Sequence, residues 1–265
     1  MRWPLLLSIM AISCVSSFPS AERGFLLRSI EVEGSSRPYS VYVPNEYDGS
    51  ADFPLILFLH GGGERGSEGL RPTAVGIGSA IRFSPDRWPA IVLFPQTPVG
   101  EEWAGEAETV AMAVLDETIA EFRIDSDRVY LTGMSMGGAG TWSIANQHAK
   151  RFAAVVAVCG WVVPMAGRPE YARDLRESGY DPERPYGSIA ENLRTMPVWI
   201  WHGDDDTVVP VEESRQMAAA LRDVGAPVRY TELPGGNHNA WDPAYGNREL
   251  SEWLFAQRRV DREGR

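Results

Sequence analysis

The sequence predicts an α/β domain built on a mainly parallel β-sheet with helices on both faces, and three observations support this fold class. Short apolar runs rich in β-branched residues alternate along the chain with amphipathic helical segments. Several of these runs are apolar at almost every position, as strands buried on both faces must be. The 265 residues also suit one domain of this class.

The first two predicted strands are separated by only a turn, so we expect an antiparallel hairpin at the sheet edge. They cover residues 26–32 and 39–43. Six further strands are expected to form the parallel part of the sheet. They are 54–59, 90–94, 129–132, 153–158, 198–201 and 228–233.

Helices are predicted where apolar residues recur at every third or fourth position. The clearest such segment is 106–122, and 136–148, 212–224 and 247–257 show the same pattern. One stretch, 161–187, is rich in Pro, Arg and Tyr and is too long for an ordinary loop. It is interpreted either as a short cap-like insertion over a site or as mere packing.

The N-terminus resembles an export signal. Arg2 precedes an apolar stretch, 5–15, which is followed by small and turn-forming residues. This stretch is shorter than the about 20 residues that a transmembrane helix needs. We expect residues 1–21 to be a signal peptide and the chain to be exported to the periplasm or the medium. A lipoprotein signal that ends before Cys14, with a lipid-anchored product, is the less favoured alternative.

Composition excludes several function classes. The net charge of -11 and the absence of a basic run argue against a nucleic-acid partner. Two cysteines, of which Cys14 falls in the signal, argue against a disulfide in the mature chain. Four histidines without a His-Glu-x-x-His or Cys-x-x-Cys pattern argue against a metal site. Lys150 is the single lysine, which disfavours a Ser-Lys dyad.

The motif Gly133-Met134-Ser135-Met136-Gly137 follows a predicted strand and precedes a predicted helix. This is the Gly-x-Ser-x-Gly pattern in the strand-turn-helix setting that it requires. The flanking glycines allow the tight, strained turn from which a nucleophilic serine protrudes. Ser135 is therefore the predicted nucleophile.

A glycine run, Gly61-Gly62-Gly63, follows the strand 54–59. At this place a hydrolase can present backbone N–H groups to a developing oxyanion. The alternatives are a plain turn or a phosphate cradle, but no Gly-Lys-Ser/Thr follows. The N–H groups of Gly62 and Met136 are the predicted oxyanion hole, and Gly63 is a candidate third donor.

The acid and the base should come later in the chain, in the order Ser, then Asp or Glu, then His. Three acids, Asp204 to Asp206, follow the strand 198–201, although such a run can also be a solvated loop that caps the next helix. Of the four histidines, His60 and His202 each precede a Gly at a strand end, and His148 ends a helix. His238, in a loop after the last strand, is the predicted base.

Together these motifs resemble the α/β-hydrolase superfamily, and within it the bacterial carboxylesterase/phospholipase and prolyl-oligopeptidase-like branch of serine hydrolases. The resemblance covers residues 38–255 and implies a single catalytic domain, 22–265. The family pattern His-Gly-x-x-Asp-x-x-Val-Pro selects Asp206 as the acid, with Asp205 as the runner-up. It implies a Ser135-His238-Asp206 triad that works through an acyl-enzyme, without a cofactor or a metal.

The favoured function is an exported serine esterase that cleaves a small-molecule or polysaccharide-linked carboxylic ester. A serine peptidase of the prolyl-oligopeptidase type is the alternative, although such enzymes usually carry a large extra domain. A non-catalytic binding protein on a hydrolase scaffold is a remote third reading, because it would normally lack a triad residue. Trp103 and Trp161 are expected to line the substrate pocket. Nothing in the sequence selects an oligomeric state.

Overall fold

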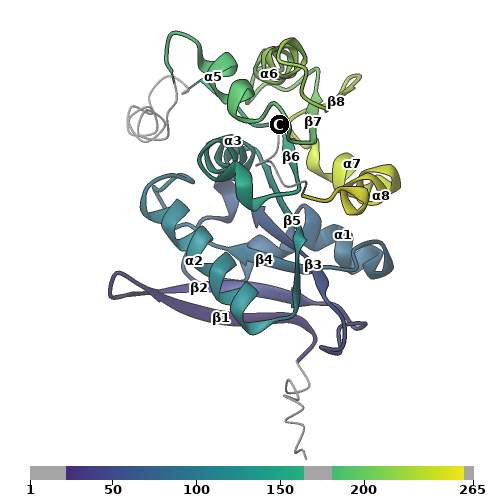
Figure 1. The fold of residues 1–265 in the computed structure, drawn as a ribbon. Coiled ribbons are helices and arrows are strands. Elements are labelled where there is room, and N and C mark those ends of the chain that lie inside the picture. Colours follow the sequence, from purple (N-terminus) through teal and green to yellow (C-terminus); the bar gives the residue numbers. More distant parts are fainter. Residues whose placement is uncertain (1–21, 164–180, 260–265) are drawn as a thin grey trace, which may run out of the picture.

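The computed structural model describes residues 22–163 and 181–259 (Figure 1). The predicted signal peptide, 1–21, lies outside the described residues, as do residues 164–180 of the predicted insertion. Among the described residues, none of the helices has the length and the continuous apolar composition that a membrane span requires.

An eight-stranded sheet forms the centre of the fold, in the order β1-β2-β4-β3-β5-β6-β7-β8. The first two strand pairings are antiparallel and the other five are parallel. This is the predicted fold class, with all eight predicted strands present. The strands are β1 (Gly24–Val32), β2 (Ser35–Val43), β3 (Phe53–Leu59), β4 (Ile91–Pro95), β5 (Ile124–Met134), β6 (Ala154–Val158), β7 (Val198–Gly203) and β8 (Val228–Leu233).

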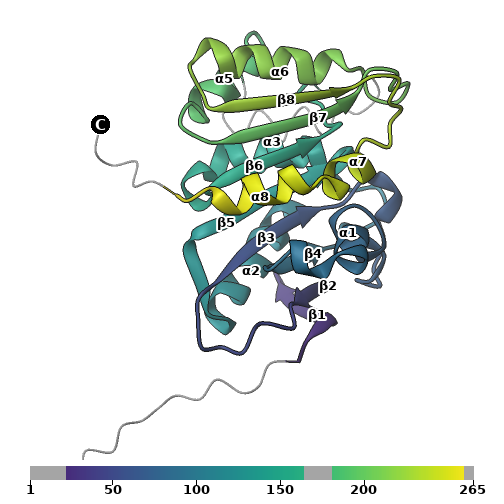
Figure 2. The same ribbon diagram turned by 90° about the vertical axis from the view of Figure 1, so that its right-hand side faces the viewer.

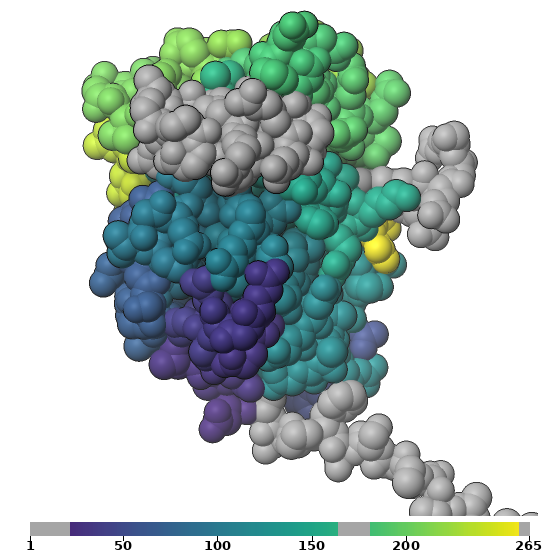
Figure 3. Space-filling view, turned by 90° about the vertical axis from the view of Figure 1, so that its left-hand side faces the viewer, coloured from purple at the N-terminus to yellow at the C-terminus, as the bar shows by residue number. Residues whose placement is uncertain are grey.

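The antiparallel hairpin at the sheet edge is confirmed, with Val32 opposite Ser35 next to the turn. The two turn residues, Glu33 and Gly34, have positive φ angles of 50° and 79°. Such angles give a two-residue turn the twist of its flanking strands. The space-filling view in Figure 3 shows this hairpin at one end of the molecule and the α5 and α6 region at the other.

Helices cover both faces of the sheet (Figures 1 and 2). One face packs against α2 (Glu106–Glu121), α3 (Met136–His148), α5 (Pro185–Asn192) and α6 (Glu212–Asp223). The opposite face packs against α1 (Ile77–Phe83), α7 (Trp241–Gly246) and α8 (Arg248–Ala256). The helices predicted at 106–122, 136–148, 212–224 and 247–257 correspond to α2, α3, α6 and α8.

Strand β3 shows how one apolar run fills both layers of the core. Leu55 and Leu57 point into the layer under α2 and α3, whereas Ile56 and Phe58 point into the layer under α1 and α7. All four are 0% exposed. Burial of each such side chain contributes about 1.5 to 3 kcal/mol, so this strand anchors the loop that follows it.

The structure departs from the predicted elements in two ways. Strand β5 begins at Ile124, five residues before the predicted start at 129. The prediction missed this first half because it is polar and carries an Arg128–Asp125 ion pair with a 2.7 Å separation. Helices α1, α5 and α7 were not predicted. They have only 7, 8 and 6 residues, too few for a helical period to stand out.

Candidate active site

Ser135 lies in the turn between β5 and α3, at the carboxyl end of the central strand. Its backbone has φ 53° and ψ -118°, a conformation that costs a non-glycine residue about 1 to 3 kcal/mol. The Ser135 N–H donates to the carbonyl of Val158 at 2.9 Å. Hydrogen bonding and packing therefore hold the strained turn that makes the hydroxyl protrude.

The flanking glycines are required by close backbone approaches. A Cβ on Gly137 would lie 1.9 Å from the carbonyl oxygen of Leu59, and one on Gly133 would lie 2.2 Å from that of Gly137. Real Cβ atoms do not come so close to backbone atoms. Glycine at both positions therefore allows the first turn of α3 to pack directly against the backbone at the ends of β3 and β5.

His238 links Ser135 to Asp206. Its Nε2 lies 2.9 Å from Ser135 Oγ, and its Nδ1 lies 2.7 Å from Asp206 Oδ2. Because the carboxylate only accepts, Nδ1 carries the proton that it donates to Asp206, which leaves Nε2 of the neutral ring free to accept from the Ser135 hydroxyl. The indole ring of Trp241 packs edge-on against His238, with 5.4 Å between ring centroids.

Asp206 is the member of the acidic run that reaches His238. Its side chain is 0% exposed. Burial by itself would raise the pKa of Asp206, but hydrogen bonds from His202, His238 and the backbone N–H groups of Val209 and Val208 hold it well below its usual range. The carboxylate therefore stays ionised at every pH at which a histidine titrates.

The other two acids of the run take different places. Asp204 accepts from the N–H of Gly235 at 2.6 Å, and both Asp204 and Asp205 are exposed. No side chain of the run caps α6, whose N-cap residue is Val211. The solvated-loop interpretation thus fits two of the three acids.

The predicted oxyanion donors, Gly62 and Met136, lie on the two backbone segments that meet at Ser135. Met136 is the first residue of α3, where an N–H has no partner inside the helix. In the neighbouring loop, a Cβ on Gly61 would lie 3.5 Å from Ser135 Cβ. Within the described residues, no hydrogen bond engages the N–H of Gly62 or of Met136.

His60 anchors the glycine loop and is 0% exposed. Its Nδ1 donates to the carbonyl of Gly61 at 2.6 Å, and its Nε2 accepts from the N–H of Thr97 at 3.0 Å. Burial lowers the pKa of His60 to about 4. A neutral imidazole with one donor and one acceptor therefore fixes the start of this loop.

The two tryptophans predicted to line the substrate pocket lie instead in the packed interior. Trp103 is 1% exposed and donates its Nε1–H to the carbonyl of His60 at 2.9 Å. Trp161 is 2% exposed and belongs to the core layer under α3 and α5. Neither indole offers the open face that stacking on a substrate requires. Both tryptophans are close in sequence to loops of the site. That closeness did not show whether their side chains contact a substrate or support the loops from the interior.

Among residues 22–163 and 181–259, one group of side chains has the composition and spacing of a metal site. Its members are Cys159, Asp206 and His238, whose ligand atoms lie within 4.8 Å of one another. Burial strongly raises the pKa of the Cys159 thiol, which keeps it protonated, and the thiolate is the form that binds metals. Asp206 and His238 are already bonded to each other. This set therefore fits hydrogen bonding better than metal coordination.

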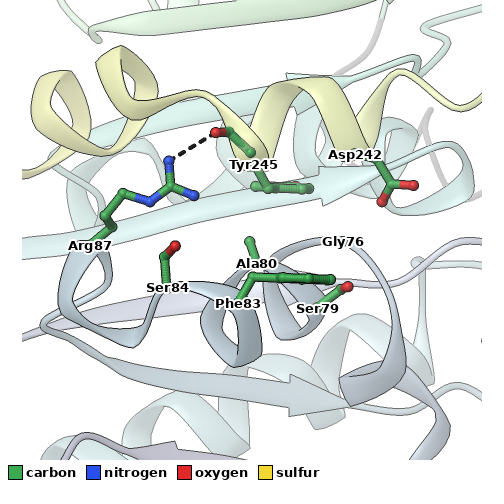
Figure 4. Close-up of a pocket in the computed structure, with 9 residues that line it drawn as sticks. Gly76, Ser79, Ala80, Phe83, Ser84, Arg87, Asp242 and Tyr245 are labelled. Atoms are coloured by element: carbon green, nitrogen blue, oxygen red, sulfur yellow. Dashed lines mark hydrogen bonds between the residues drawn. The ribbon is translucent and has the colours of Figure 1, made fainter.

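A groove of about 510 Å³ lies between α1 and α7 (Figure 4). Phe83, which is 86% exposed, and Asp242, in the helix that follows the His238 loop, contribute to its lining. Arg87 closes one end by donating to the carbonyl of Gly246 at 2.9 Å. The groove thus combines an exposed aromatic ring with polar groups.

A sequence model of the prolyl oligopeptidase family matches residues 101–261. The chain belongs to this family. Its relatives include esterases and peptidases by name. "Putative esterase NocK" of Nocardia uniformis is 26% identical and aligns with 88% of this chain and 72% of its own length. "Dipeptidyl-peptidase 5" of Aspergillus fumigatus is 25% identical and aligns with 77% of this chain and 31% of its own length.

Two further relatives and one solved structure are also similar to this chain. "Probable feruloyl esterase C" of Aspergillus niger is 24% identical over 78% of this chain and 69% of that protein. An "Uncharacterized secreted protein" of Arthroderma benhamiae is 28% identical over 72% of this chain, which spans 22% of that protein. The crystal structure of a thermostable esterase superposes with a TM-score of 0.74 at 30% identity, covering 89% of this chain and 63% of that one. The fold is that of the α/β-hydrolase superfamily.

Proposed function

We propose that this member of the prolyl oligopeptidase family is an exported serine hydrolase that cleaves carboxylic esters. The observation that carries the proposal is the continuous hydrogen-bond chain from Ser135 Oγ through His238 to Asp206, with links of 2.9 and 2.7 Å. A serine is a weak nucleophile until an adjacent base takes its proton, and the base needs a third group to fix its tautomer. Ser135, His238 and Asp206 meet these requirements, and each follows a different strand, β5, β8 and β7.

In the proposed reaction, Ser135 Oγ attacks the ester carbonyl carbon while His238 Nε2 accepts the hydroxyl proton. The carbonyl oxygen becomes an oxyanion that the N–H groups of Gly62 and Met136 stabilise. The tetrahedral intermediate collapses, His238 returns the proton to the departing alcohol, and an acyl-enzyme remains. A water molecule, deprotonated by His238, then releases the carboxylic acid and restores the Ser135 hydroxyl.

Esterase relatives favour an ester over a peptide substrate. The thermostable esterase is 30% identical across 89% of this chain, and NocK aligns with 72% of its own length. A peptidase is the second candidate, because the matching family and the dipeptidyl-peptidase relative carry that name. A non-catalytic binding protein is the weakest reading, since such a protein has no need of a complete Ser-His-Asp chain.

An ester linked to a polysaccharide is the substrate class we favour within this function. The feruloyl esterase relative supports it by name. The groove between α1 and α7 provides an exposed aromatic ring, Phe83, and a carboxylate, Asp242, which suit the faces and hydroxyls of sugars. The signal-like N-terminus and the secreted relative support export, which would bring the enzyme to such polymers.

The test compares the mature chain with its Ser135→Ala variant on one panel of substrates. The panel holds short and long p-nitrophenyl acyl esters, a feruloyl ester and an aminoacyl-proline amide. Ester turnover that disappears in the variant is the expected result. Cleavage of the amide alone would establish the peptidase instead, and turnover that persists in Ser135→Ala would overturn the assignment of the nucleophile.

A further inference from the structure

A second buried histidine, His202, lies directly behind the carboxylate of Asp206. It is 0% exposed at the end of β7. Its Nε2 is 3.1 Å from Asp206 Oδ2 and 3.1 Å from the carbonyl oxygen of Val209. On the other side of the ring, Nδ1 is 2.7 Å from the hydroxyl oxygen of Ser214 in α6. The ring therefore bridges α6 and the acid that contacts His238.

The partners of His202 determine which nitrogen carries the proton. Carboxylate and carbonyl oxygens accept but do not donate, so Nε2 must hold a hydrogen and donate it. In the neutral ring Nδ1 then accepts, and the Ser214 hydroxyl is its donor. Ser214 is 3% exposed, so water does not compete for this bond. The hydrogen bonds run in one direction, from Ser214 to His202 to Asp206.

His202 completes the hydrogen bonding of the Asp206 carboxylate. Oδ1 accepts from the N–H groups of Val208 and Val209, at 2.8 and 3.0 Å. Oδ2 accepts from His238 and from His202. The terminal torsion of an aspartate is otherwise broad, and donors on both oxygens confine it. Without His202, Oδ2 would face the His238 proton alone.

We infer that His202 is a positioning residue for the reaction at Ser135. Its Nε2–H holds the Asp206 carboxylate in the plane that His238 requires and takes up part of the negative charge that otherwise acts on His238 alone. This inference rests on the proposed function, because it assigns His202 to the same serine chemistry. It gives the buried His-Gly of this strand end a role that its sequence neighbourhood, typical of a turn, does not reveal.

Replacement of His202 should change both the rate and its pH dependence. His202→Phe keeps a planar ring and removes both nitrogens. Displacement of a catalytic group by about 1 Å can cost about 10²-fold, so we expect a loss of about 10- to 100-fold in kcat with little change in KM. More of the charge on Asp206 then favours the protonated form of His238, so the acid-side midpoint of the activity profile should move to higher pH.

Conservative and matched variants separate positioning from mere packing. His202→Gln can place an amide N–H near the former Nε2 and should restore most of the rate. Ser214→Ala removes the donor to His202 and should lower kcat several-fold with the same direction of pH shift. Its matched control is Ser251→Ala in α8, because Ser251 is also 3% exposed and donates only to the carbonyl of Arg248. A packing effect would alter the folded fraction without moving the pH midpoint.

The decisive experiment measures the rate at which a fluorophosphonate reagent modifies Ser135 between pH 5 and 9. This reagent reports on the nucleophile without knowledge of the natural substrate, and circular dichroism reports the folded fraction of each variant. Slower modification of His202→Phe, an upward-shifted midpoint and recovery in His202→Gln are the expected results. A folded His202→Phe with the rate and midpoint of the parent would overturn the role of His202 and leave the proposed function standing.

Two further outcomes complete the test. If the parent is not modified, or Ser135→Ala is modified equally, the proposed function fails and the role of His202 fails with it. If His202→Phe does not fold, the comparison of Ser214→Ala with Ser251→Ala tests the inference. Ser214→Ala that matches Ser251→Ala in rate and pH midpoint would then overturn the inference.

Discussion

Two strand ends in this protein carry the same dipeptide, His-Gly, and use it differently. His60 follows β3 and His202 belongs to the end of β7, and both rings are 0% exposed. His60 bonds to backbone groups, the carbonyl of Gly61 and the N–H of Thr97. His202 donates to the carboxylate of Asp206. The His60 ring orders a loop that presents backbone N–H groups, whereas the His202 ring orients a charged carboxylate.

A local motif thus sets where a histidine ring is buried but not what the ring does there. Around His60 the partners are neutral, and burial lowers the pKa of the ring to about 4. Around His202 the partner is Asp206, whose pKa lies well below its usual range despite its burial because of the hydrogen bonds it accepts from His202, His238 and the backbone. The two loops should therefore respond to different substitutions and to different pH ranges.

The largest expected effect comes from the loop after β7. Asp206→Asn keeps the shape of the acid and removes its charge, so His238 loses the partner that fixes its tautomer. Turnover should fall by about 10⁴-fold. Ser135→Ala and His238→Ala should cost a similar amount, measured as kcat on the best ester of the panel.

These three changes act on one unit, so their combination provides the control. The triple variant should be hardly less active than the worst single variant. Losses that multiply across the three positions would show that the residues act independently and would contradict the proposed triad.

Acid should destabilise the loop after β3 more than the loop after β7. The unfolded chain binds a proton on His60 below pH about 6.5, whereas the folded chain does so only below about 4. The unfolded state therefore holds more protons between these values, and the free energy of unfolding falls as the pH drops through them. The contribution of His60 to this fall is at most about 3 kcal/mol.

Urea unfolding at pH 7.5 and pH 4.5 measures this effect. His60→Gln cannot take up a proton and can still accept from the N–H of Thr97, so its stability should depend less on pH than that of the parent. Asp206 does not titrate in this window, because its pKa is depressed. An unchanged pH dependence in His60→Gln would assign the acid sensitivity to other groups.

A smaller effect is expected from the indole that supports His60. Trp103→Phe keeps most of the packing but removes the N–H that donates to the His60 carbonyl. A slight displacement of the glycine loop should lower kcat roughly tenfold. Trp88→Phe is the matched control, because Trp88 is also 1% exposed and its Nε1 has no hydrogen-bond partner within the described chain. Equal losses of kcat in both variants would refute the supporting role of Trp103.

The smallest effect is expected at the acid next to Asp206. Asp205 is exposed, and its backbone N–H bonds to the carbonyl of Gly236 without involving its carboxylate. Asp205→Asn should change kcat by less than about twofold, as surface changes away from the chemistry usually do. A loss comparable with that of Asp206→Asn would make Asp205 the acid.

Much of the scaffold could be predicted from local patterns. Short apolar, β-branched runs marked all eight strands, and the short separation of the first two marked the hairpin. The polar first half of β5 and the three short helices α1, α5 and α7 were missed. Their backbone is ordered by contacts with distant segments, such as the pairing of Phe53 with Ile124, and no period in their own sequence signals it.

Local patterns in the sequence singled out the strand ends with polar side chains and the residues Ser135 and His238, because glycine spacing and strand boundaries are local properties. The family pattern favoured Asp206 over Asp205, but it is the fold that brings Asp206 against His238, places His202 behind it and buries Trp103 and Trp161. The hydrogen bonds from His238 to Ser135 and to Asp206 span 103 and 32 residues. Contacts of this kind depend on the order in which the strands pair, and strand order is a property of the whole sheet.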